Sequence, residues 1–252
     1  MAREIPIIWL DSVDSTNTEV YRRADRLDNM SVIAARDQTA GRGQRGNSWL
    51  VDPGTNLTFS MYLRFGEGHL PPLPAEEQFE LGEAATLAVA RLMEEEGIDA
   101  RIKWPNDIYV RNNKICGMLI ENSLEGRYVR SSIVGIGVNC NQTDFPPQLA
   151  NPVSMKILTG RHFELEPLLC RLAELLRENV LKLSDVEGRR ELREAFLSKM
   201  YRIGQLHDYT DLVTGEVFKG TIVGLGKDSR LKVRKEDGSY KEFAFKEISY
   251  IL

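Results

Sequence analysis

The segment Thr39–Leu50 reads T-A-G-R-G-Q-R-G-N-S-W-L and is the most informative stretch of the chain. Its three glycines let the backbone bend sharply and approach a ligand closely. Arg42 and Arg45 can each place a guanidinium fork on carboxylate or phosphate oxygens. Trp49 presents a large flat face to a ring. This combination predicts a loop that closes over an anionic ligand containing a ring.

Two nucleotide-binding patterns match this chain in spacing but not in context. The loop contains G-x-G-x-x-G, the dinucleotide fingerprint, which requires a helix to open at the third glycine. A D-P-G-T turn and a strand predicted over 57–63 follow it instead. The segment Gly215–Gly220 has P-loop spacing, but Thr221 stands where the phosphate-binding lysine is required. Neither pattern therefore predicts a nucleotide site.

Composition excludes several classes of protein. The 252 residues carry a net charge of −4 and have an isoelectric point of about 5.6, which argues against nucleic acid as a main partner. The chain has no run of twenty apolar residues to span a membrane, and its first apolar stretch is too short for a signal peptide. The three cysteines never occur as C-x-x-C, which predicts reduced thiols and a cytoplasmic location. The three histidines lie far apart, so neither a zinc site nor a histidine-based triad is predicted.

Hydrophobic periodicity predicts helices and strands in mixed order. The sequence T-x-x-E at 16–19 has the spacing of a capping box and predicts a helix that reaches about Leu27. Apolar residues at helical spacing predict a helix over 75–96 that Gly97 ends, and more helix after Pro167 and over 187–201. Strands are predicted at 5–10, 31–36, 57–63, around 102, and at 108–110, 115–121 and 132–138.

The character of the chain changes near 203–204, where we place a domain boundary. From Gly204 to Leu252 the sequence has only strand and turn signals, including Asp237-Gly238 as a hairpin turn. About fifty residues of this kind predict a small barrel.

Four further clusters can carry chemistry. S-T-N at 15–17 stands at a helix start, where capping is the favoured interpretation and a polar pocket is the alternative. K-W-P-N-D at 103–107 is typical of a turn between strands. Lys114 is by default a solvated lysine, but Gly117 within the same strand indicates close approach of a ligand. Glycines at 135 and 137 share one face of a strand, which can form the floor of a flat cavity.

Together these motifs identify a family. The set S-T-N, Q-T-A-G-R-G-x-x-G-x-x-W, K-W-P-N-D, K-x-x-G-x-L-x-E and G-I-G-x-N, in this order, resembles biotin protein ligase (biotin–[acetyl-CoA-carboxylase] ligase) over the whole chain. The resemblance implies an α+β fold: a class II synthetase-like catalytic domain over 1–203, with a mixed β-sheet and helices, and an SH3-like barrel over 204–252. Some members have an N-terminal helix-turn-helix, for which we expect no room before Ser15.

The resemblance also implies an activity. Such enzymes join biotin to ATP, form biotinyl-5′-AMP with release of pyrophosphate, and transfer biotin to a lysine of a biotin carboxyl carrier protein. Magnesium accompanies the phosphates, and no enzyme nucleophile takes part. We expect a cytoplasmic ligase, monomeric or homodimeric, that acts on a carrier domain and binds neither nucleic acid nor membrane.

The motif positions imply roles for individual residues. Lys114 and Arg42 correspond to the cations on the biotin carboxylate and the α-phosphate. The implied biotin-binding residues are Ser15, Thr16, Asn17, Gln38, Gly41, Arg42, Gly43, Gln44, Lys114, Gly117 and Gly135. The implied nucleotide-binding residues are Arg45, Trp49, Asn106, Asp107 and Asn139, with Asp107 near magnesium. The loop of the family usually reads G-R-G-R, so Gln44 replaces a cation here, and we expect weaker retention of the adenylate.

Two alternatives remain open. A lipoate or octanoate ligase of the same fold would use the same kind of lysine with a different pocket, whereas the loop and the C-terminal barrel favour biotin. A biotin-binding regulator without catalysis could dispense with Lys114 and Arg42, and both are present.

Overall fold

The computed structural model describes residues 4–252, except for the side chain of Arg45. The strands of the first part are β1 (Ile7–Val13), β2 (Val32–Gln38), β3 (Leu57–Arg64), β4 (Leu73–Pro74), β5 (Arg101–Lys103), β6 (Asp107–Val110), β7 (Asn113–Glu125) and β8 (Tyr128–Val138). Its helices are α1 (Thr16–Arg23), α2 (Phe79–Glu95), α3 (Met155–Thr159), α4 (Leu165–Lys182) and α5 (Val186–Ser198). Short 3-10 turns are η1 (Ala24–Arg26), η2 (Gln44–Gly46) and η3 (Ala75–Glu77).

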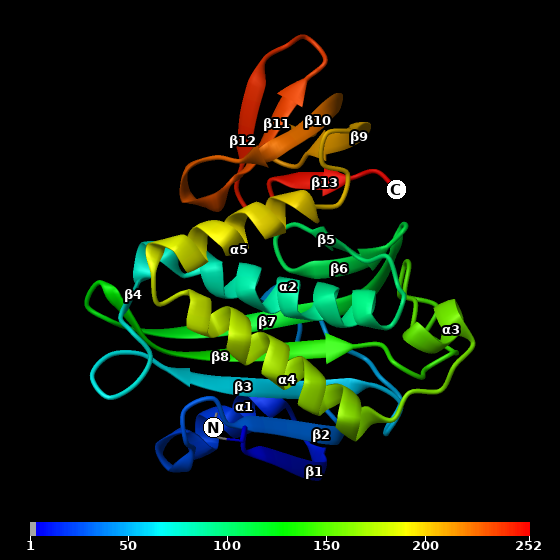
Figure 1. Ribbon diagram of the computed structural model, residues 1–252. Helices are drawn as coiled ribbons and strands as arrows, with labels where there is room; N and C mark the ends of the chain where they lie inside the picture. The colour runs from blue at the N-terminus through cyan, green and yellow to red at the C-terminus, as the bar shows by residue number, and fades with distance from the viewer. Residues whose placement is uncertain (1–3) are drawn as a thin grey trace.

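These eight strands form one sheet in the order β1-β2-β3-β8-β7-β6-β5, with β4 paired to β8. The sheet is mixed because β1 and β2 are parallel and the remaining pairs are antiparallel. Helices α2 and α4 lie across one face, and α5 lies between α2 and the second sheet (Figure 1). The first sheet and its helices confirm the predicted α+β class.

Helix α2 is buried on nearly every side, from Leu81 to Met93. Its alanines favour helix and leave little bulk between neighbouring elements, so it fits between the sheet and helices α4 and α5. Gly97 adopts φ +79° directly after it, and the next amide, that of Ile98, donates to Met93 O, which ends the helix as predicted.

The helices near and after Pro167 differ from the predicted pattern in two respects. Helix α4 starts at Leu165, before that proline, which a first helical turn tolerates. A break at 183–185 separates α4 from α5, and Asp185 caps α5 by accepting a hydrogen bond from the amide of Gly188.

The C-terminal part forms a second, antiparallel sheet. Its strands are β9 (Leu206–Asp211), β10 (Val217–Leu225), β11 (Leu231–Lys235), β12 (Tyr240–Phe243) and β13 (Ile248–Tyr250), with the turn η4 (Lys227–Ser229). The predicted hairpin turn joins β11 to β12, and Gly238 there adopts φ +85°. The strand order is β12-β11-β10-β9-β13. This five-stranded antiparallel sheet confirms the predicted small β domain, and its barrel is not closed, because the edge strands β12 and β13 do not pair with each other in the described chain. The domain boundary near 203–204 stays a prediction.

Within residues 4–252, none of the helices is both long and apolar enough to cross a membrane.

The interface between α2 and α5 contains a buried charged group. Glu83 on α2 is 1% exposed, and its Oε1 lies 2.8 Å from Nε of Arg193 on α5. Burial raises the pKa of Glu83 to about 7, because desolvation outweighs the attraction of Arg193, and the nearby Glu80 adds repulsion.

We predict that Glu83 makes the folded protein less stable as pH rises. The unfolded chain loses this proton near pH 4.5 and the folded chain near pH 7, so between these values the folded state holds more protons. The free energy of unfolding should therefore fall by about 3 kcal/mol across this window because of Glu83. Glu83→Gln should flatten that dependence in urea titrations, whereas Glu94→Gln, exposed on the same helix, should retain it. Equal slopes in both variants would contradict the assignment.

Candidate active site

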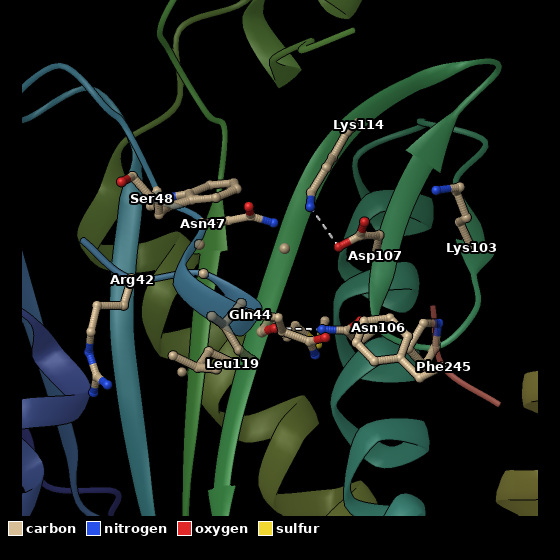
Figure 2. Close-up of a pocket in the computed structure, with 18 of the residues that line it drawn as sticks. Arg42, Gln44, Asn47, Ser48, Lys103, Asn106, Asp107, Lys114, Leu119 and Phe245 are labelled. Carbon is tan, nitrogen blue, oxygen red and sulfur yellow. Dashed lines mark hydrogen bonds and ion pairs between the residues drawn. The ribbon is translucent and has the colours of Figure 1, made fainter. Parts of the chain in front are cut away.

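One cavity of about 300 Å³ lies at the junction of the two sheets. Its walls come from the start of α1, the loop after β2, the turn between β5 and β6, the strands β7 and β8, and the C-terminal sheet. Figure 2 shows the side chains of Gln44 and Asn47 in the loop extending toward the turn that carries Asn106 and Asp107. The predicted residues in its lining are Ser15, Thr16, Asn17, Gln38, Arg42, Gly43, Gln44, Trp49, Asn106, Asp107, Lys114, Gly117 and Gly135.

The floor of the cavity consists of glycines. The register of the sheet pairs Gly117 on β7 with Gly137 on β8, and Gly135 with Leu119 in the next row. A Cβ on Gly135 would lie 2.2 Å from Asn17 Oδ1, and one on Gly137 would lie 2.3 Å from Trp49 Cε2. Any larger residue would therefore displace the side chains above it, which confirms the predicted flat floor.

Above Gly135 the first residues of α1 form a buried polar network. Gln38 Oε1 accepts a hydrogen bond from the Thr16 amide at 2.8 Å. The Ser60 hydroxyl lies 2.5 Å from Asn17 Oδ1, and Asn17 Nδ2 donates to Glu121 Oε2 at 2.7 Å. Thr16, Asn17 and Ser60 are all nearly inaccessible to solvent. The network fixes each donor and acceptor at this end of the cavity.

This network corrects the capping interpretation of S-T-N. Ser15, not Thr16, is the N-cap of α1, and it makes no side-chain capping hydrogen bond. Glu19 does not reach back to the N-cap and pairs with Arg22 and Arg23. Helix α1 also ends at Arg23, before the predicted Leu27, and the turn η1 follows it. These polar side chains line the cavity because the tertiary network binds them more effectively than local capping does.

The glycine-arginine loop has a compact conformation. The amide of Trp49 donates to Gly41 O at 2.9 Å, and that of Gly43 donates to Asn47 O at 2.6 Å. The Trp49 ring lies against the glycine floor, where its Nε1 is buried without a hydrogen-bond partner in the described part of the chain. Arg42 points away from Lys114 (Figure 2) and pairs with Glu121 at 3.0 Å.

Lys114 is directed to the floor by a β-bulge. In a regular strand Lys114 and Gly117, three residues apart, would face opposite sides. The register between β6 and β7 shifts by one residue at Ile115, since Ile108 pairs with Cys116 and Tyr109 with Lys114. Lys114 Nζ consequently lies 2.7 Å from Asp107 Oδ1 and next to Gly117 (Figure 2). The pair is a third or less exposed, so it is held in place at the centre of the cavity.

Three of the predicted site residues are not among the described residues that line the cavity. Gly41 lies in the adjoining loop, and a Cβ there would lie 2.4 Å from Trp49 O, so its role is in the backbone turn. Asn139 lies outside the cavity lining and donates to Val153 O at 3.0 Å, which holds the segment after β8. The side chain of Arg45 lies outside the described residues. Roles of these residues toward a ligand stay predictions.

Several lining residues were not predicted. Lys103 ends β5 and lines the cavity beside Phe245 and Tyr250 of the C-terminal sheet. Lys103 could have been found from its motif, K-W-P-N-D, because it lies directly opposite Asp107 across the hairpin. The aromatic residues carry no local signal, since they reach the cavity only by packing of the second sheet.

The described residues form no closed metal site, and two buried cysteines are unreactive. No group of three or more His, Cys, Asp or Glu side chains is placed to hold a metal within residues 4–252. Burial raises the pKa of Cys140 to about 12 and that of Cys116 well above its usual value, so both thiols stay protonated. Asp107 is the carboxylate of the cavity that could share a magnesium ion with substrate phosphates.

Known proteins share this arrangement. Residues 9–139 match the model of the biotin/lipoate A/B protein ligase family. The chain is 34% identical over 205 residues to a biotin–[acetyl-CoA-carboxylase] ligase of Paracoccus denitrificans, covering 78% of this chain and 81% of that one. It is 36% identical over 147 residues to the bifunctional ligase/repressor BirA of Bacillus subtilis, covering 57% of this chain and 43% of that longer protein.

A solved structure extends the similarity to the fold. Biotin protein ligase from Aquifex aeolicus, in complex with biotin and ATP, superposes with a TM-score of 0.77 at 27% identity over 97% of both chains. The similarity thus extends over both sheets. The family match, the identity to the Paracoccus ligase and this superposition agree, and the chain belongs to the biotin/lipoate A/B protein ligase family.

Proposed function

We propose that this protein is an ATP-dependent biotin–protein ligase. It activates biotin to biotinyl-5′-AMP, releases pyrophosphate, and transfers biotin to a lysine of a biotin carboxyl carrier protein. The observation that carries the proposal is the placement of Lys114 on a glycine floor, between a closed polar pocket and a charged turn. One cation so placed can contact the acid and the phosphate at the same time.

The polar end suits the ureido ring of biotin, which has two N–H donors and one carbonyl acceptor. Ser15, Thr16, Asn17 and Gln38 supply amide and hydroxyl groups there, and the network with Ser60 and Glu121 orients them. Oriented dipoles bind a polar ring without the cost of reorganisation. The glycine floor lets Asn17 at the helix start lie close to the sheet at this end of the cavity.

Lys114 lowers the electrostatic repulsion between the two substrates, which is the main barrier of the reaction. The carboxylate of biotin and the α-phosphate are both anionic and repel each other at the distance where they react. An ammonium between them offsets this repulsion, and its three N–H groups can serve oxygens of both. Asp107 holds this ammonium over the floor at 2.7 Å before substrates arrive. Catalysis then needs positioning and charge, and no covalent enzyme intermediate.

The nucleotide would lie against Trp49, with Gln44 and Asn106 beside it. Arg42 must leave Glu121 to reach the phosphates. That pair is 46% and 39% exposed, so breaking it costs about 1 kcal/mol or less. The loop has few large apolar groups, and we expect it to order over the adenylate and exclude water from the mixed anhydride. Magnesium would arrive with the phosphates and contact Asp107.

We predict that pyrophosphate release from ATP and magnesium depends on biotin. Release should appear with biotin as the acid and be absent with lipoate or octanoate. Release with lipoate alone would instead assign the chain to the lipoate branch of the family. Tight biotin binding without release would favour a biotin-binding regulator. Addition of a biotin carrier domain should then yield a biotinylated lysine, detected by mass spectrometry.

We predict that Lys114→Ala abolishes adenylate synthesis and preserves the fold. The side chain is a third exposed and its ion-pair partner Asp107 is also partly exposed, so its loss should change the thermal midpoint little. Synthesis should fall at least about a hundredfold because the substrate anions lose their shared cation. Lys182→Ala, which removes an exposed surface ion pair, is the matched control and should retain activity. Normal turnover by the Lys114 variant would remove this residue from the mechanism.

We predict that Gln44→Arg slows dissociation of biotinyl-AMP. Gln44 lines the cavity beside Asn106 but cannot pair with the adenylate phosphate as a cation does (Figure 2). An added guanidinium should lower the dissociation rate about tenfold, corresponding to one charge-assisted hydrogen bond. The measurement is stopped-flow release of preformed biotinyl-AMP. Equal rates in the variant and the parent protein would show that retention does not depend on this position.

A further inference from the structure

We propose that Lys103 binds the β- and γ-phosphates of ATP, the part that leaves as pyrophosphate. This assignment rests on the proposed adenylation reaction and adds a subsite to it. It follows from the strand register, from the aromatic contacts of Lys103 and from the order of charged groups across the sheet.

The register places Lys103 on the reactive face of the sheet. Lys103 on β5 is paired with Asp107 on β6, Asp107 with Gly117 on β7, and Gly117 with Gly137 on β8. Directly paired residues of antiparallel strands face the same side. Lys103 therefore continues the row that forms the floor of the cavity, and its ammonium is directed toward Asp107 in Figure 2.

Lys103 provides the uncompensated charge of this row. Asp107 is neutralised by Lys114 at 2.7 Å, whereas Lys103 has no carboxylate within ion-pair distance among the described residues. Its Nζ lies 4.8 Å from the ring centre of Tyr109 and 4.9 Å from that of Tyr250. The two rings hold the ammonium by cation–π attraction and leave other N–H groups free for an anion.

The order of groups matches an in-line displacement. Asn17 lies over β8, Lys114 and Gly117 lie on β7, Asp107 is on β6, and Lys103 is on β5. A carboxylate oxygen that enters from the Asn17 side forms the new bond to the α-phosphorus beside Lys114. The bond from that phosphorus to the bridging oxygen breaks, and pyrophosphate leaves with the electron pair on the far side. Lys103 lies on that side and stabilises the charge of the leaving group, with no proton transfer.

Tyr250 makes the C-terminal sheet part of this subsite. It lies on β13 and also contacts Tyr201 at 6.0 Å and Tyr209 at 5.4 Å between ring centres. Tyr250 is thus a positioning residue: it sets where the Lys103 ammonium lies and does not itself reach the reacting atoms.

Ligands that differ only in the leaving group test the proposal directly. Calorimetric titrations of the full chain with ATP, AMP and inorganic pyrophosphate, in magnesium buffer, compare the parent protein with Lys103→Met and Lys103→Arg. Methionine keeps much of the hydrocarbon packing and removes the charge. Affinity for ATP and pyrophosphate should fall about tenfold to a hundredfold in Lys103→Met, as for loss of charge-assisted hydrogen bonds. Affinity for AMP should stay within about twofold, and Lys103→Arg should recover most of the loss.

Two further variants distinguish a role of Lys103 in phosphate binding from a role in packing against tyrosine rings. Lys232 also lies over a tyrosine, 5.3 Å from the Tyr240 ring centre, but it does not line the cavity. Lys232→Met should therefore leave all three affinities unchanged. Tyr250→Leu should weaken ATP binding less than Lys103→Met does, with AMP unaffected.

If Lys103→Met weakened the binding of AMP and of ATP equally, Lys103 would have a structural role and the proposal would be overturned. Unchanged affinity for ATP in this variant would overturn it as well. Failure of the parent protein to form biotinyl-AMP would refute the proposed ligase activity instead. Even then the difference between ATP and AMP binding would decide the role of Lys103.

Discussion

The absence of side chains at three positions of the central strands is the constraint on which the site depends. Gly117, Gly135 and Gly137 lower the surface of the sheet, so that Asn17 and the Trp49 ring can approach the backbone. The same sheet is filled with apolar residues on its other face, where α2 and α4 cover it. One face thus supplies the stability and the other is left free for a ligand. A methyl group on Gly135 or Gly137 would close the space that the polar residues surround.

The turn between β5 and β6 connects this floor to the second sheet. Lys103 and Asp107 stand at the two ends of this turn, and both line the cavity. Within the turn, Trp104 Nε1 donates to Ser229 O at 3.1 Å. Ser229 in turn accepts a hydrogen bond from Arg193, which pairs with the buried Glu83. The position of the charged turn therefore depends on contacts from α2, α5 and the C-terminal sheet together. This explains why a small second sheet takes part in a site whose motifs lie before residue 140.

Much of the site could be predicted from short motifs, because each has a local physical meaning. A glycine-rich loop with arginines predicts an anion site, and alternating glycines on a strand predict a flat floor. Local reasoning was wrong where distant partners compete. The S-T-N segment has the composition of a helix cap, yet Gln38 and Ser60 bind two of its members in a buried network. Whether the edge strands of the C-terminal sheet pair with each other could not be predicted either, since edge pairing depends on strand positions that periodicity does not encode.

The sequence by itself determined the family resemblance, the α+β class, the order of most helices and strands, and the residue types that gather at the cavity. These follow from hydrophobic period and from residues whose chemistry is the same in any context. The tertiary structure alone decided where the charges lie. The bulge at Ile115 turns Lys114 onto the face of Gly117, and Arg42 pairs with Glu121 rather than lying beside Lys114. The register of β5 with β6 places Lys103 opposite Asp107. Strand register and bulges arise from pairing between distant segments, so they could not be derived from local sequence.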